Sequence, residues 1–250
     1  MTTRYEAWMN NVALSSLAPE IIIDDIQEQQ PKTNVESYTV AIWNGTRVMH
    51  SARPSLSVTV RFMVRAYDPA RRQAIVHDIV TWAKGGKQLE VSSRTGLFLD
   101  CVVSAVPYVK SAQKWTEQLT VTFTAYSVPF WQEKEPVTAT QTAANGSVAI
   151  TPNGTEDCLL EFDVKNMGSD RLNALSVSVN EKTIAFNDLQ IVPSQEFSVR
   201  YVDGVLVLPV SKRTPESADN LVLKPNEENV VSFTADQSAK ITFTARGLYS

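Results

Sequence analysis

The chain has 250 residues, of which 43% are hydrophobic and 20% are charged. That length fits one large domain or two ordinary ones, and the composition is that of a globular protein. Two cysteines exclude a disulfide scaffold, and no apolar run approaches the roughly 20 residues needed to span a bilayer. Because the first residues contain no apolar signal segment, we expect folding in a reducing cytosol and no membrane association.

Charge divides the chain unevenly. Residues 1–133 carry 13 basic and 12 acidic side chains, for a net charge of +1, whereas residues 134–250 carry 10 and 15, for −5. A domain that binds nucleic acid on its own is usually strongly basic. We therefore expect no stable, sequence-specific nucleic-acid binding.

Two strand signals come first in the chain. Asn44-Gly45, a pair that suits a type I′ turn, separates Ser37–Trp43 from Thr46–Met49 and predicts a hairpin. Leu56–Arg65 then alternates apolar and polar residues with a period of two, which predicts a half-buried strand.

A helix is predicted over residues 69–84. Asp68 provides an N-cap, Pro69 occupies the first helical position, and Gly85-Gly86 ends the segment. Apolar residues at spacings of three and four form a stripe that should pack on a sheet. The stripe comprises Ala70, Ala74, Ile75, Ile79, Trp82 and Ala83.

A boundary is predicted after a further alternating strand, Leu119–Ala125. Residues 132–145 are polar, rich in Thr and Ala, and contain Pro136, so we interpret residues 134–144 as a linker or crossover. Residues 145–250 then hold seven or eight short strand candidates between turn signals, the pattern of a β-sandwich. One of these turns, Asp203-Gly204, predicts a second hairpin, between Glu196–Val202 and Val205–Val210. The predicted fold class is mainly β: an N-terminal β-sandwich with one helix over residues 1–133, and a second β-sandwich over 145–250.

Residues able to do chemistry are few and scattered. Neither histidine has converging acidic or thiol partners in the sequence. Cys101 is interpreted as a buried strand thiol, and Cys158 falls in the other predicted domain. Adjacent carboxylates on a strand face opposite sides, so the acidic pairs are interpreted as solvated turns rather than acid/base dyads. The residues weighed are His50, His77, Cys101, Cys158, Asp24-Asp25, Glu156-Asp157 and Glu227-Glu228. We predict no catalytic, cofactor-binding or metal-binding residues and leave other binding residues unassigned.

Two further patterns favour structural interpretations. Three glycosylation-type triplets begin at Asn44, Asn145 and Asn153, and each is interpreted as an Asn-Gly turn. The most basic stretch is interpreted as a salt-bridge face between subunits or domains, since no aromatic residues interleave to stack bases. It comprises Arg47, Arg53, Arg61, Arg65, Arg71 and Arg72, and Arg61 and Arg65 share one strand face.

The order of several motifs resembles the distal tail protein (Dit) family of long-tailed, non-contractile bacteriophages. These motifs are the Trp82-Ala83 helix end, the turn of residues 93–96 (Ser-Arg-Thr-Gly), the exit of residues 129–131 (Pro-Phe-Trp), and a closing strand pair within residues 225–249. The resemblance spans nearly the whole chain.

The resemblance implies a structural virion protein rather than an enzyme, with no cofactor. Family members form a ring, usually a hexamer, at the distal end of the tail. The N-terminal sandwich lines a channel for DNA, and a galectin-like C-terminal sandwich points outward. Implied partners are further copies of the chain, the tail-tube protein, a tail-associated hub or lysin protein, and a receptor-binding protein of the baseplate. The implied location is the tail tip, after synthesis in the host cytoplasm.

Three other functions stay open. A tail-tube or tail-terminator subunit would polymerise into tubes or cap them, but needs no outward domain. A carbohydrate-binding adhesion module would use the second sandwich, although all five tryptophans precede residue 132. A hydrolase would rest on scattered carboxylates alone.

Overall fold

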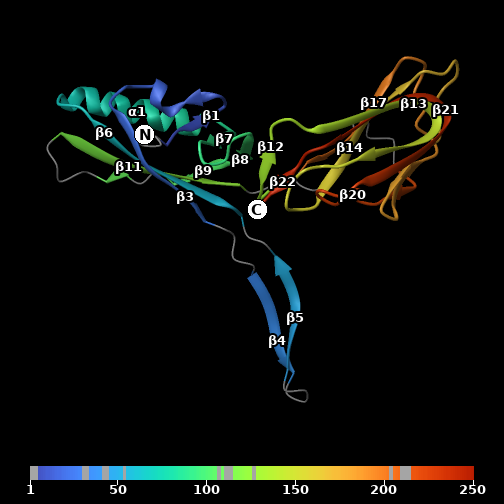
Figure 1. Ribbon diagram of the computed structural model, residues 1–250, viewed down its shortest axis with the longest axis horizontal. Coiled ribbons are helices and arrows are strands. Elements are labelled where there is room, and N and C mark those ends of the chain that lie inside the picture. Colours follow the sequence, from blue (N-terminus) through green and yellow to red (C-terminus); the bar gives the residue numbers. More distant parts are fainter. Residues whose placement is uncertain are drawn as a thin grey trace. The chain divides into compact units, whose positions relative to one another are not determined.

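A computed structural model of the protein describes residues 5–29, 34–40, 45–52, 55–105, 108–109, 115–125, 128–202, 205–208 and 215–250 (Figure 1). Within 34–52 and at 108–109 the description is confined to the backbone. The chain forms two compact units, Met1–Trp131 and Gln132–Ser250, and each is described by itself. The fold is mainly β with one α-helix in the part of the chain that is described, which confirms the predicted class.

The first unit consists of short and medium strands around one helix. Its elements are β1 (Ala7–Met9), β2 (Val12–Ala13), a 3-10 turn (Leu14–Ser16), β3 (Ile21–Gln29), β4 (Asn34–Val40), β5 (Gly45–Ala52), β6 (Ser57–Arg65), α1 (Pro69–Lys84), β7 (Gln88–Val91), β8 (Leu97–Asp100), β9 (Val102–Ala105), β10 (Tyr108–Val109) and β11 (Thr116–Thr124). The strand β12 (Trp131–Glu133) straddles the boundary between the units.

The main sheet of the first unit is antiparallel, in the order β10-β11-β6-β3, with β9 also paired to β11. The predicted period of two in β6 is confirmed, because Val58, Val60, Phe62 and Val64 are all buried. Helix α1 packs on that buried face (Figure 1), where Trp82 meets Phe123 of β11 with ring centroids 6.2 Å apart. One face of the sheet is thus covered and the other is not.

The predicted helix over 69–84 is confirmed, with Asp68 as its N-cap. The Asp68 carboxylate accepts hydrogen bonds from the backbone N–H groups of Ala70 and Arg71, at 3.1 and 3.2 Å. The predicted apolar stripe is wrong at two positions, because Ala70 and Ala74 are exposed while Arg72 is buried. The aliphatic stem of an arginine can cover apolar surface that an alanine is too short to reach.

Strands β4 and β5 pair antiparallel from Asn34 opposite Ala52 to Val40 opposite Gly45, with a register shift between Glu36 and Ser37, and form a two-stranded sheet of their own. The hairpin predicted here is confirmed as a strand pair. Its turn residue Asn44 lies outside the described residues, as does Asp203-Gly204 in the second predicted hairpin, whose strands β17 and β18 also pair.

The second unit is built around one long strand. Its elements are β13 (Val137–Ile150), β14 (Cys158–Asn166), β15 (Leu175–Val179), β16 (Lys182–Phe186), β17 (Glu196–Val202), β18 (Val205–Val207), β19 (Ser217–Ala218), β20 (Val222–Leu223), β21 (Asn229–Ala245) and β22 (Leu248–Tyr249). The strand order is β18-β17-β14-β21-β15-β16-β19, and β13 also pairs with β21.

Strand β21 belongs to both layers of this sandwich. Its residues 239–245 pair with β14, and its residues 232–235 pair with β15. Side chains from both layers form one core, whose largest members are Phe162, Phe186, Phe197, Phe233 and Phe243.

Two sequence interpretations need correction around β13. Residues 137–144 were interpreted as part of a linker, but they are strand paired with β21. Asn145-Gly146 is not a turn; it lies inside β13, beside a register shift between Ala143 and Asn145. A strand with one neighbour and one solvent-facing side tolerates a polar, Thr-rich composition that resembles a linker.

Candidate assembly surfaces

The uncovered face of the main sheet is a broad surface of hydroxyl and amide groups. It is made by the alternate residues of β6 and β11 that point away from the helix, with Gln27 and Gln29 of β3 in register beside them. The outward residues of the two strands are Ser57, Thr59, Arg61, Met63, Arg65, Gln118, Thr120, Thr122 and Thr124.

Hydroxyl groups on this face, which we call the hydroxyl face, hydrogen-bond across the strands. The Oγ1 atoms of Thr59 and Thr122 are 3.3 Å apart, as are the hydroxyls of Ser57 and Thr124. Thr124 also donates to Ser104 Oγ at 2.9 Å. Cross-strand pairs of this kind stabilise the sheet and hold the hydroxyl groups in fixed geometry.

The basic stretch of the sequence does not form one surface. Arg61 and Arg65 are exposed at the hydroxyl face, so their predicted common strand face is confirmed. Arg71 instead pairs with Glu20 at 3.2 Å, which lowers the pKa of the Glu20 carboxyl, and Arg72 is buried. The side chains of Arg47 and Arg53 lie outside the described residues.

An exposed aromatic pair lies where β6 ends and β11 begins. Tyr67 is 79% exposed and Trp115 is 44% exposed, and their ring centroids are 5.0 Å apart in an edge-on arrangement. The two backbones are joined here by a hydrogen bond from Ala66 N to Trp115 O of 3.2 Å. Large exposed aromatic side chains are typical anchors of protein interfaces.

Arg72 holds the connection that carries Tyr67. Its Nη1 donates to the carbonyl oxygens of Ala66 and Tyr67, at 2.6 and 3.1 Å. Its Nε lies 3.5 Å from Glu117 Oε1 without hydrogen-bond geometry, so this attraction is Coulombic. Both side chains are nearly buried, at 11% and 12% exposure. Sequence analysis missed this group because its partners lie on a loop and on a distant strand.

The residues weighed for chemistry are not brought together. His77 is exposed on α1, and the His50 side chain lies outside the described residues. Cys101 and Cys158 are free and buried, and burial raises the pKa of each thiol to about 12. A thiol with so high a pKa is a poor nucleophile at neutral pH.

The acidic pairs differ in their settings. Asp24-Asp25 lies in β3 beside a register shift rather than in a turn, and burial together with the charge of Asp25 raises the pKa of Asp24. Glu227-Glu228 precedes β21 in a turn region, as predicted. Among the residues that are described, no cluster of three or more His, Cys, Asp or Glu side chains could hold a metal ion.

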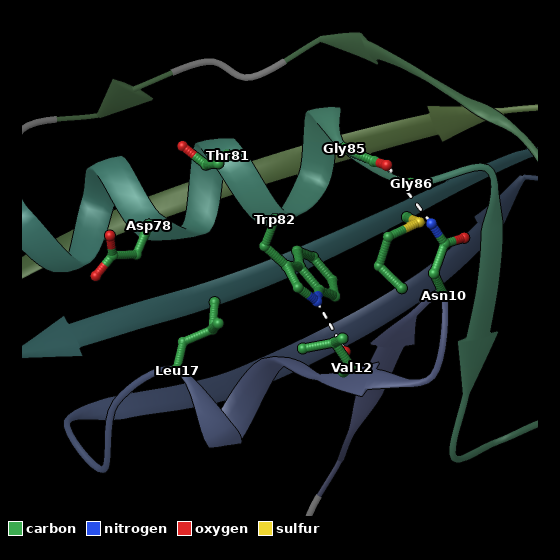
Figure 2. Close-up of a pocket in the computed structure, with 9 residues that line it drawn as sticks. Asn10, Val12, Leu17, Asp78, Thr81, Trp82, Gly85 and Gly86 are labelled. Carbon is green, nitrogen blue, oxygen red and sulfur yellow. Dashed lines mark hydrogen bonds between the residues drawn. The ribbon is translucent and has the colours of Figure 1, made fainter.

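A shallow cavity of about 380 Å³ lies at the C-terminal end of α1 (Figure 2). Within its lining, the Trp82 indole N–H donates a hydrogen bond to the Val12 carbonyl oxygen at 2.8 Å. Asp78 is the single ionisable residue in its lining, and the rest is apolar, amide, hydroxyl or glycine. No helix among the described segments is long and apolar enough to cross a membrane.

These observations define the class of fold first: two mainly β units, the first with a sheet covered on one face by a helix, the second a β-sandwich. No family model matches the sequence, and no curated protein matches it. Solved structures do match. The chain is similar to the Dit (gp 19.1) protein of phage SPP1, with 12% identity, coverage of 97% of this chain and 98% of that chain, and a TM-score of 0.69.

Two structures of the phage P2 baseplate in its activated conformation also match. The one with Ca has 9% identity, coverage of 99% and 98%, and a TM-score of 0.54. The one with Sr has 10% identity, coverage of 97% for both chains, and a TM-score of 0.52. The likeness to distal tail proteins that the sequence motifs predicted is therefore confirmed at the level of the fold, over both units.

Proposed function

We propose that this protein is a non-enzymatic structural component of a phage tail tip, a distal tail protein of the baseplate. The observation that carries the proposal is the match to SPP1 Dit over 97% of this chain and 98% of that chain, because a likeness confined to one β-sandwich would be far less specific. SPP1 Dit is described as a hub of the adsorption apparatus in phages that infect Gram-positive hosts. On this proposal the protein joins the tail tube to the host-attachment device.

The first unit, within residues 1–133, forms the ring, most simply a homo-hexamer. A closed ring needs heterologous contacts, in which one surface of a subunit meets a different surface of the next. The exposed pair Tyr67 and Trp115 provides an aromatic anchor for one side of such a contact. The hydroxyl face lines the channel. Apart from Arg61 and Arg65, its outward residues on β6 and β11 are uncharged, which would limit the attraction of DNA to the channel wall.

The second unit, with residues 145–250 as its galectin-like core, points outward and carries the receptor-binding and other baseplate proteins, while the tail-associated hub or lysin protein sits below the ring. The virion tail tip is then the site of action, after synthesis in the host cytoplasm. Five buried phenylalanines fill its core, and no tryptophan lies beyond residue 131 to stack on a sugar ring. These features support a structural rather than a carbohydrate-binding role.

The test is the assembly state of the full chain. Native mass spectrometry should give a closed species of six copies of the 27.7 kDa chain, and negative-stain images should show rings. A matched pair of variants makes the test specific: Trp115→Ala should shift the population toward monomers, whereas Val12→Ala, at an exposed apolar residue elsewhere, should not.

Three outcomes would contradict the proposal. A wild-type chain that stays strictly monomeric at high micromolar concentration would contradict ring formation. Open-ended tubes in the images would favour the second candidate, a tail-tube subunit, and caps on added tubes would favour a tail terminator.

A further inference from the structure

Strand β13 is an unusually long edge strand. It has 14 residues, against about 5–6 for an average strand, and within the described parts of the chain it pairs with β21 and with no other strand. Because β21 runs through both layers, β13 forms the margin of both (Figure 1). In an antiparallel pair every second residue directs its backbone N–H and C=O away from its partner. The outer side of β13 therefore presents a row of unpaired donors and acceptors.

The usual protections of an edge strand are largely missing from β13. Natural edges carry lysines, prolines or inward-pointing charges that prevent another strand from adding. None of the 14 residues of β13 is charged and none is proline. One irregularity, between Ala143 and Asn145, interrupts the strand, and it leaves residues 137–143 as a regular stretch.

Side chains on this stretch also leave apolar surface to cover. Val137, Ala139 and Ala143 pack against the core of the second unit but are only partly buried, and Gln141 lies between the two alanines in the same row. On the other side of the strand Thr138, Thr140 and Thr142 are exposed. An added strand would cover the first row with its own apolar side chains and continue the second with hydroxyl groups.

We propose that the edge of β13 over residues 137–143 is a docking site for an extended strand of a different protein. The chemistry of the edge defines that segment: about seven residues, uncharged on its inner side, alternating apolar residues with mainly Thr or Ser. Backbone hydrogen bonds supply the affinity, and the apolar row sets the register.

A second copy of this chain fits the edge less well. Two β13 strands paired antiparallel over residues 137–143 about a two-fold axis would place Gln141 opposite Ala139 on both strands, so the amide would interrupt the apolar row. A two-fold contact would also join two rings face to face, whereas a tail is polar. That last argument, unlike the others, rests on the proposed function.

The first experiment uses a defined probe with the full-length protein. The probe is a fluorescein-labelled peptide with the sequence of residues 239–245, the alternating segment that pairs with the inner side of β13. Fluorescence anisotropy should show saturable binding with a dissociation constant at or below about 1 mM, and a scrambled peptide should not bind. Hydrogen exchange should show new protection at alternate amides of residues 137–143.

Variants then locate the site. Thr140→Lys places a charge on the edge and should weaken peptide binding about ten-fold or more, as should Thr138→Lys. Ser232→Lys is the matched control, since Ser232 is exposed on the interior strand β21 and its lysine should leave binding unchanged. Circular dichroism establishes that each variant is folded before it is compared.

Three results would overturn the inference: no binding with unchanged exchange at residues 137–143, equal binding by the Thr140→Lys and wild-type proteins, or a concentration-dependent dimer that Thr140→Lys abolishes, which would assign the edge to a second copy. Ring formation is measured separately by native mass spectrometry. If the chain binds the peptide but forms no ring, the docking inference stands and the proposed tail-tip function is contradicted.

Discussion

Arg72 shows how strongly one side chain can depend on its surroundings. Its neighbour Arg71 pairs with Glu20 at the surface, while Arg72 reaches inward to two carbonyl oxygens and to Glu117. Two arginines that are adjacent in the chain are therefore expected to contribute differently to stability. Exposed ion pairs contribute little to stability, whereas removal of one partner from a buried pair leaves an uncompensated charge.

We expect Arg72→Ala to lower the free energy of unfolding by about 3 kcal/mol, because Glu117 and two carbonyl oxygens lose their partner. Urea denaturation followed by circular dichroism measures the change. Arg71→Ala is the control and should leave the midpoint close to that of the wild type. Equal losses in the two variants would show that burial of Arg72 is not what matters.

The two thiols give a prediction about alkaline pH. Burial raises their pKa to about 12 from 9.0, so between these values the unfolded chain releases thiol protons that the folded chain retains. Their contribution to stability is full below about pH 9 and is lost as pH rises toward 12. Denaturation midpoints measured from pH 8 to 11 should fall less steeply in the Cys101→Ala/Cys158→Ala variant than in the wild type.

Iodoacetamide at pH 8 checks the same burial directly. Both thiols should stay unmodified in the folded protein and react in denaturant, as counted by intact mass. Rapid labelling of either thiol in the folded protein would contradict the burial from which the pKa shift arises.

At the scale of elements, local sequence signals set the boundaries of α1, whereas the sheet decides which of its residues are buried. The α1 boundaries follow from Asp68, Pro69 and Gly85, which act on neighbouring backbone groups, and the structure keeps them. The buried face of α1 was predicted only in part, because the choice between Ala74 and Arg72 depends on what the sheet presents. The same dependence hid β13, whose composition is that of a linker until β21 is placed beside it.

Loss of the helix cap should have a moderate cost. We expect Asp68→Ala to reduce the free energy of unfolding by about 1 kcal/mol, because two backbone N–H groups at the start of α1 lose their acceptor. Asp68→Asn should keep most of that stability, and Gln73→Ala, at an exposed position of the same helix, should cost nothing measurable. Thermal denaturation resolves the three variants, and a loss in Gln73→Ala equal to that in Asp68→Ala would argue against capping.

At the scale of the whole molecule, the covered and uncovered faces of the main sheet separate two environments. Helix α1 closes the face made by Val58, Val60 and Phe62, while the hydroxyl face stays open. In the proposed ring this open face surrounds the channel. A charge added there is repeated in every subunit, so one substitution should produce a large change in the total charge of the channel wall.

A topological test distinguishes the channel from the outer surface. In a ring of the Thr59→Lys/Thr122→Lys variant, we expect linear duplex DNA to be retained at low salt and covalently closed circular DNA to escape, because only a free end can enter a closed ring. The control Gln73→Lys/His77→Lys adds the same charge on the exposed side of α1 and should not prefer either form. Filter binding across a salt series measures both, and equal retention of linear and circular DNA by the first variant would place its lysines outside the channel.

The sequence by itself determined the kinds of element and their order. Alternation in Leu56–Arg65 and the cap at Asp68 are properties of adjacent residues, and the backbone responds to them locally. The order of motifs was enough to predict the fold that the match to SPP1 Dit confirms. The tertiary structure alone decided what those elements expose. Trp115 meets Tyr67, Glu117 meets Arg72, and β13 is left as an edge because residues far apart in the chain are brought together, and such pairings leave no periodic trace in the sequence.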